Sequence, residues 1–77
     1  MEEIEKRFGR TVRTLREQTG LSQEAFAVKA GIHRTYVSSI ELGKVQVSIR
    51  IAEQLAQALE VSLSKVWREV EKLGGAE

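Results

Sequence analysis

Four side chains rich in hydrogen-bond donors stand together within residues 31–44, GIHRTYVSSIELGK. His33, Arg34, Thr35 and Tyr36 bring imidazole, guanidinium and hydroxyl groups to one short stretch. The guanidinium of arginine is a planar fork of N–H donors that can pair with two acceptors at once, as a phosphate or the edge of a base presents them. The chemistry that this stretch can perform is therefore hydrogen-bonded recognition.

The remainder of the sequence has no pattern typical of catalysis or metal binding. The chain has 77 residues with no Cys and one His, so a thiolate site and a zinc-type ligand cluster are both missing. There is no nucleophile–base pair and no glycine-rich phosphate loop, and a chain this small has little room for a pocket. We therefore expect no enzymatic activity, no cofactor, no metal and no small-molecule ligand.

Composition and charge indicate one small domain, residues 1–77. The sequence contains no stretch that could span a membrane, and its first ten residues lack the apolar segment of a signal peptide, so we expect a soluble, cytoplasmic protein. The net charge is only +1, but five cations fall within eleven residues: Lys6, Arg7, Arg10, Arg13 and Arg16. A nearly neutral domain can still carry a basic face.

The apolar spacing predicts an all-α fold, a compact bundle of five helices. We expect helices over about residues 3–19, 23–30, 33–41, 49–59 and 63–73, with a connector at 44–47 and a frayed tail at 74–77. The first helix carries apolar residues every three or four positions, and Gly20 and Gly31 are suited to end helices. Ser22, Ser48 and Ser62 are suited to cap the helices that follow them.

Two of these helices are short and are joined by the tight segment AGI, residues 30–32. Ala27 is small enough to allow a close helix crossing, and Gly31 suits the turn. Ile32, Val37 and Ile40 can fix the second helix of the pair on the domain. Residues 22–41 thus predict a helix-turn-helix, whose second helix can lie in the major groove of DNA.

The segment LSQEAFAVKAGIHRTYVSSIELGK, residues 21–44, resembles the helix-turn-helix of the Cro and phage-repressor family. The resemblance extends over roughly residues 5–73 and implies a lambda-repressor-like DNA-binding domain. Within that family, the size of the chain and the run RTYVSSIE are similar to the controller proteins of restriction–modification systems, which are small dimeric regulators. Glu60 and Val47 stand where the family often has glycine and proline.

The resemblance implies roles for individual residues. The base-reading positions correspond to His33, Arg34, Thr35, Ser38 and Ser39. Gln23 corresponds to a glutamine that holds a DNA phosphate, and the further candidates for phosphate contact are Tyr36, Lys44, Ser48, Arg50, Arg10 and Arg13. Arg16 and Glu41 match positions that form a buried, structural ion pair. The residues themselves leave two alternatives open, because His33 could be a solvated cap and the ring of Tyr36 could pack on the domain.

Several apolar residues exceed what one small core needs, namely Val45, Val47, Ile49, Ile51 and Trp67. They predict a surface that meets a second copy, with residues 48–73 contributing most of the dimer contact. A two-fold dimer presents its recognition helices about 34 Å apart and reads a palindrome. We therefore expect a homodimeric transcription regulator that binds a palindromic operator, with two dimers on adjacent sites and contact with RNA polymerase as further expectations.

Two other functions use the same fold. In an antitoxin-like protein the module would also bind a partner protein, but little chain remains after Leu73 to do so. In an adaptor the fold would have lost DNA binding, and Gln23, Arg34 and Lys44 argue against this because they are suited to nucleic acid. DNA binding is thus the favoured interpretation.

Overall fold

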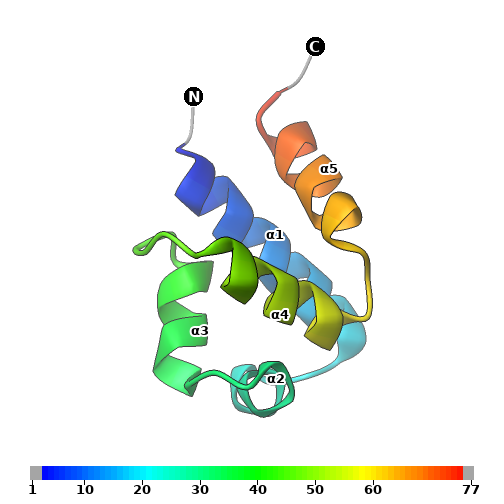
Figure 1. Ribbon diagram of the computed structural model, residues 1–77. Coiled ribbons are helices and arrows are strands. Elements are labelled where there is room, and N and C mark those ends of the chain that lie inside the picture. The colour runs from blue at the N-terminus through cyan, green and yellow to red at the C-terminus, as the bar shows by residue number, and fades with distance from the viewer. Residues whose placement is uncertain (1–2, 76–77) are drawn as a thin grey trace.

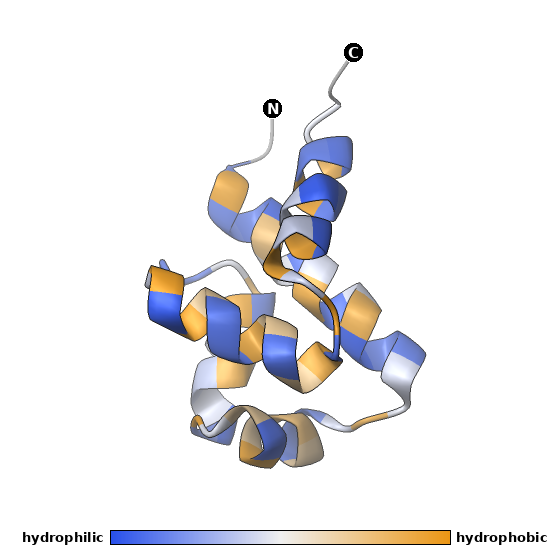
Figure 2. Ribbon diagram, turned by 45° about the vertical axis from the view of Figure 1, so that its right-hand side comes forward, coloured by the Kyte–Doolittle hydropathy of each residue, from blue (hydrophilic) through white to orange (hydrophobic). Residues whose placement is uncertain are grey.

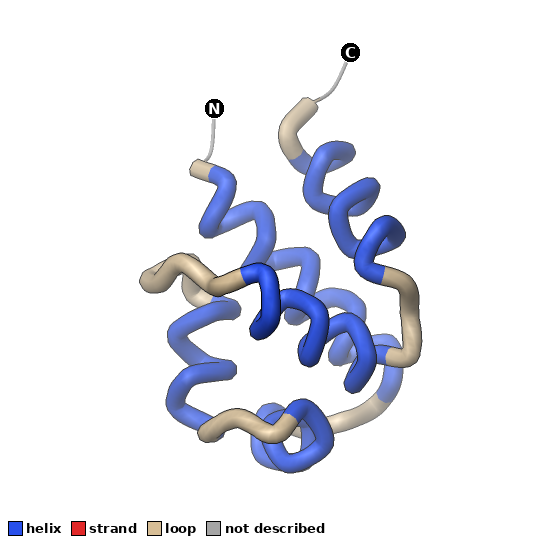
Figure 3. Tube along the Cα trace, viewed as in Figure 1, coloured by secondary structure: helices blue, strands red, loops and turns tan. Residues whose placement is uncertain are grey.

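A computed structural model describes residues 3–75, which form five helices and no strand (Figure 1, Figure 3). The helices are α1 Ile4–Thr19, α2 Gln23–Ala30, α3 Arg34–Glu41, α4 Ile49–Leu59 and α5 Leu63–Leu73. The predicted all-α bundle and its order of helices are confirmed, and each predicted boundary lies within about one residue of the observed one. Part of the predicted frayed tail, Ala76 and Glu77, lies outside the described residues.

Local signals in the sequence set the ends of these helices. The hydroxyl oxygens of Ser22, Ser48 and Ser62 accept hydrogen bonds from backbone N–H groups three residues later, at 3.0–3.1 Å. Gly20 and Gly31 end α1 and α2 in the left-handed conformation, which glycine adopts without steric cost. Local residue preferences thus explain the starts of α2, α4 and α5 and the ends of α1 and α2.

The core lies between α1 and the other helices. Phe8, Val12 and Leu15 form the apolar stripe of α1, and they are buried together with side chains from all four other helices. α1 packs against α3, α4 and α5, while α2 packs against α3 and α4. Apolar residues alternate with polar ones along each helix in Figure 2, as expected for helices with one buried face.

Gly9 brings α1 unusually close to the end of α3. A Cβ atom at this position would overlap the carbonyl oxygen of Ile40 and would lie 2.8 Å from the carbonyl oxygen of Glu41. Both obstacles are backbone atoms, which cannot turn aside as a side chain can. The absence of a side chain at Gly9 thus sets the distance between α1 and the C-terminal end of α3.

One expectation about the connector needs correction. Val45 and Val47 do have an internal role, because both are half-buried and pack against the core. At the end of α5, the N–H of Gly74 donates to the carbonyl of Val70 at 3.2 Å, and that carbonyl also accepts from Nη1 of Arg7 at 3.2 Å. Within residues 3–75, no helix is long and apolar enough to cross a membrane.

Candidate nucleic-acid interface

The predicted recognition helix α3 is anchored on one side and exposed at its start. Val37 and Ile40 are fully buried, with 0% and 1% of their surface exposed. Arg34 and Thr35, in the first turn, are exposed. An α-helix with its side chains is about 10–12 Å across, so a helix such as α3 fits the major groove of B-DNA, which is about 12 Å wide.

His33 caps α3 with its own side chain. Its Nδ1 accepts a hydrogen bond from the backbone N–H of Thr35 at 3.2 Å and lies 2.8 Å from the Thr35 hydroxyl oxygen. Histidine is not among the favoured residue types at this position, but its ring provides the cap. The same contacts hold His33 and Thr35 in a fixed relation at the exposed end of the helix.

The remaining candidates on and after α3 differ in exposure. Ser38 and Ser39 are half-buried one turn beyond the cap, and Tyr36 packs its ring partly against the core. Lys44 and Arg50 are exposed. Exposed cations near the end of a recognition helix are suited to contact phosphates on either side of a groove.

Three further candidates for phosphate contact have exposed side chains. The hydroxyl oxygen of Ser48 accepts from the N–H of Ile51 at 3.0 Å, and its O–H can still donate to a phosphate. Arg13 forms an exposed ion pair with Glu17, with Nε 3.1 Å from the carboxylate. Arg10 is exposed on α1. Exposed pairs such as Arg13–Glu17 contribute little and can exchange partners.

The start of α2 provides a second group of donors. The backbone N–H groups of Gln23 and Glu24, in the first turn, have no acceptor within the helix, and the helix dipole favours an anion there. Ser22 satisfies the N–H of Ala25 at 3.1 Å and so fixes the geometry of this turn. An arrangement of this kind is suited to bind a phosphate oxygen.

Arg16 and Glu41 form the expected ion pair. Nε of Arg16 lies 2.7 Å from Oε2 of Glu41, and Nη2 lies 3.1 Å from Oε1, which is a bidentate geometry. The Glu41 side chain is only 3% exposed. The hydrogen bond between Arg16 and Glu41 raises the pKa of Arg16 above its ordinary value. Nη1 of Arg16 also donates to the Leu21 carbonyl at 2.8 Å, so the pair joins α1, the start of α2 and the end of α3.

The structure adds a contact that the sequence did not predict. Nε2 of Gln23 donates to Oε1 of Glu41 at 2.9 Å. Gln23, expected at a phosphate, is thereby linked to the ion pair, expected to be structural. These residues lie 18 positions apart, and only the crossing of α2 and α3 brings them together.

Three of the five apolar residues predicted at a dimer interface line one groove of about 220 Å³. Val45, Val47 and Trp67 line it together with Ile4 and Phe8, and the Trp67 and Phe8 rings are 5.3 Å apart. Ile49 lies two residues beyond Val47 and is 83% exposed, whereas Ile51 packs partly against the core. Ile4, 50% exposed, belongs to this surface although the sequence analysis did not include it.

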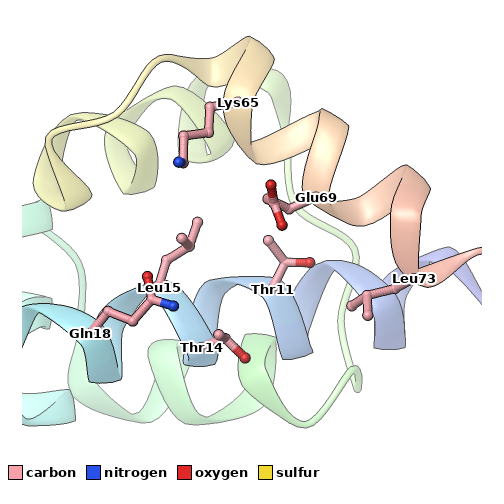
Figure 4. Close-up of a pocket in the computed structure, with 7 residues that line it drawn as sticks. All are labelled: Thr11, Thr14, Leu15, Gln18, Lys65, Glu69 and Leu73. Carbon is pink, nitrogen blue, oxygen red and sulfur yellow. The ribbon is translucent and has the colours of Figure 1, made fainter.

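A second hollow, of about 170 Å³, lies between α1 and α5 (Figure 4). Thr11, Lys65 and Glu69 are among its lining residues, and the buried Thr11 hydroxyl has no hydrogen-bond partner among the described residues. None of the candidates for DNA contact lines this hollow. Within residues 3–75, no three His, Cys, Asp or Glu side chains gather in a way that could hold a metal ion.

Comparison with known proteins identifies relatives of this chain. A profile of the helix-turn-helix domain matches residues 7–68. The control protein C.MunI of a Mycoplasma species is 44% identical over 73 residues, which cover 94% of this chain and 99% of C.MunI.

Solved structures of similar proteins agree with this fold. The restriction–modification controller protein C.AhdI from Aeromonas hydrophila is 37% identical and has a TM-score of 0.79, over 80% of this chain and 94% of C.AhdI. The controller protein C.Esp1396I, solved as a tetramer with its natural 35 base-pair operator, is 26% identical with a TM-score of 0.85, over 94% of this chain and 95% of that one.

Proposed function

Since the chain belongs to the helix-turn-helix family of control proteins, we propose that it is a transcription regulator that binds double-stranded DNA and reads the major groove with α3. The observation that carries this proposal is the placement of Arg34 and Thr35, which are exposed at the start of a helix whose opposite side is anchored by Val37 and Ile40. Such a helix can enter a groove without rearrangement of the domain.

The base-reading side chains are those at the exposed end of α3. The Arg34 guanidinium can donate to O6 and N7 of guanine together, which is the commonest specific contact. Thr35 can offer its methyl group to thymine or its hydroxyl to a base edge, and the contact of that hydroxyl with Nδ1 of His33 limits the rotation of the side chain. Ser38 and Ser39 lie within one helical turn of Thr35 and extend the reading surface along the helix.

Phosphate contacts position the reading helix. We assign them to Gln23 and the first turn of α2 on one side and to Lys44 and Arg50 on the other, because these are the donors that flank α3 along the chain. Tyr36, Ser48, Arg10 and Arg13 remain additional candidates. Contacts of this kind weaken as salt rises, because phosphate neutralisation releases counterions.

The protein acts as a homodimer on a palindromic operator. The apolar groove around Trp67 and the 83% exposed Ile49 support this part of the proposal, since exposed apolar surface of this kind favours a protein partner. The operator-bound tetramer of C.Esp1396I further supports the proposal that two such dimers occupy adjacent sites. Bound at a promoter, the protein would control a restriction–modification system by blocking RNA polymerase or contacting it.

Selection from a random duplex library at about 150 mM salt tests the proposal, because non-specific binding is weak at that salt. We expect an enriched palindrome whose half-sites are about one helical turn apart. Failure to enrich any duplex would contradict the proposal and would favour a protein partner.

Two substitutions then locate the reading surface. Arg34→Ala should weaken binding to the selected operator about 10–100-fold and leave binding to unrelated DNA nearly unchanged. Arg68→Ala, at an exposed arginine of α5, is the matched control and should leave both affinities unchanged. If Arg34→Ala weakened the affinity for operator and for unrelated DNA equally, Arg34 would be assigned to phosphate contact and not to base reading.

A further inference from the structure

The side-chain amide of Gln23 is held by a buried ion pair. Its Nε2 donates to Oε1 of Glu41 at 2.9 Å, and the same carboxylate accepts from Nε and Nη2 of Arg16 at 2.7 and 3.1 Å. Arg16 and Glu41 are 9% and 7% exposed. Gln23 is half-buried at the first position of α2. The three residues come from three different helices, so this network exists only in the folded domain.

The Glu41 carboxylate determines whether the oxygen or the nitrogen of the Gln23 amide faces it. A glutamine amide has an oxygen that repels anions and a nitrogen that donates two N–H groups. An ionised carboxylate accepts and cannot donate, so only the nitrogen of Gln23 can face Glu41. One N–H is used in that contact, and the other remains to bind an acceptor.

The second side-chain N–H of Gln23 lies at the N-terminal end of α2, where backbone N–H groups also lack acceptors. A side chain already fixed in its binding orientation loses less conformational freedom when a ligand arrives. An unpaired carboxylate next to a DNA phosphate would oppose binding, and Arg16 compensates that charge through a bidentate contact. Each member of the network thus has a separate effect on the phosphate site.

Building on the proposed function, we propose that Arg16 and Glu41 are positioning residues for DNA binding: Glu41 orients the Gln23 amide toward a DNA phosphate, and Arg16 neutralises and holds Glu41. The network places the end of α3 in direct contact with the phosphate-binding start of α2. The Glu41 carboxylate therefore fixes the position of the phosphate contact relative to the base-reading residues of α3.

A double-mutant cycle tests the proposal with Gln23→Ala, Glu41→Gln and the double variant. Duplex binding is measured by fluorescence anisotropy at a temperature where circular dichroism shows each variant folded. In the parent background, Glu41→Gln should weaken binding to operator and unrelated DNA alike, by about fivefold, and in the Gln23→Ala background by less than about twofold. Glu69→Gln, at an exposed ion pair of α5, makes the same chemical change and should alter neither affinity.

Equal losses in both backgrounds would show that Glu41 acts only through the fold and would overturn the positioning role. A parent protein that binds no duplex would overturn the proposed function as well, so the two failures are distinguishable.

A measurement on the unaltered protein guards against variants that do not fold. In its ¹H–¹⁵N NMR spectrum, one side-chain amide proton of Gln23 should be shifted downfield and protected from exchange with water. Random-coil shifts and rapid exchange for both protons would overturn the proposal without any substitution.

Discussion

Replacement of Gly9 by alanine tests the packing of the domain because two effects of opposite sign compete. Alanine is favoured over glycine inside a helix by about 1 kcal/mol. Against this, a Cβ atom at Gly9 would overlap the Ile40 carbonyl oxygen and lie 2.8 Å from that of Glu41. Overpacking costs about 1–3 kcal/mol, and we expect the upper end of that range because backbone atoms must move. The net loss should be about 2 kcal/mol.

A loss of this size is large for so small a domain. Typical stabilities per residue give about 4–12 kcal/mol for a chain of this length. A change of about 1 kcal/mol shifts the melting temperature of such a domain by about 4–8 °C, so Gly9→Ala should lower it by about 8–16 °C. The same substitution moves the end of α3 away from α1, and binding to DNA should weaken even at temperatures where the variant is folded.

Thermal unfolding followed by circular dichroism measures the effect. Gly9→Ser adds the same Cβ atom without the full helix preference of alanine and should lose still more stability. Gln18→Ala, on an exposed position of α1, should change stability by less than about 0.5 kcal/mol. A Gly9→Ala variant that melts at or above the temperature of the parent would refute the close contact between α1 and α3.

Three further substitutions test separate features. Ser62→Ala should cost about 1 kcal/mol of stability because it removes the cap of α5, whereas Ser64→Ala should cost less; chemical denaturation compares the two. The hydrogen bond from Lys29 lowers the pKa of Glu60 below 4.5, so this contact stabilises the fold above that pH and loses its effect as pH falls. Lys29→Gln should return the pKa of Glu60 toward 4.5 in an NMR titration, and an unchanged value would contradict the contact. Trp67→Ala should shift the protein from dimer to monomer in light scattering, and a persistent dimer would place the interface elsewhere.

Much of the fold could be predicted from the sequence because local signals determine it. Ser22, Ser48 and Ser62 begin helices and Gly20 and Gly31 end them, and each signal acts on its own turn. The apolar stripe of α1 likewise predicted its buried face. Such features need no knowledge of how the helices pack.

Features that depend on packing were harder to predict. The hydrogen bond between Gln23 and Glu41 joins residues whose spacing carries no periodic signal. That Val45 and Val47 also pack on the core could not be predicted, because a connector has no regular face. A cap role was one of the two alternatives for His33, and the structure shows its ring accepting the N–H of Thr35.

In the candidate site, too, local features could be predicted and features that depend on packing could not. The exposed cluster at the start of α3 was predictable from residue type and from the anchoring positions of Val37 and Ile40. Sequence alone could not show that Arg13 is paired with Glu17. Which acceptors these side chains contact on DNA remains a prediction that the proposed substitutions test.

The separation of anchor and exposed end in α3 has an evolutionary consequence. Stability resides in Val37, Ile40 and Glu41, whereas Arg34 and Thr35 are exposed and contribute few packing contacts. Substitutions at exposed positions usually change stability by less than about 0.5 kcal/mol. A lineage of such proteins can therefore acquire a new target sequence by changing two side chains while the scaffold stays the same, and a laboratory library randomised at these positions should consist mostly of folded members.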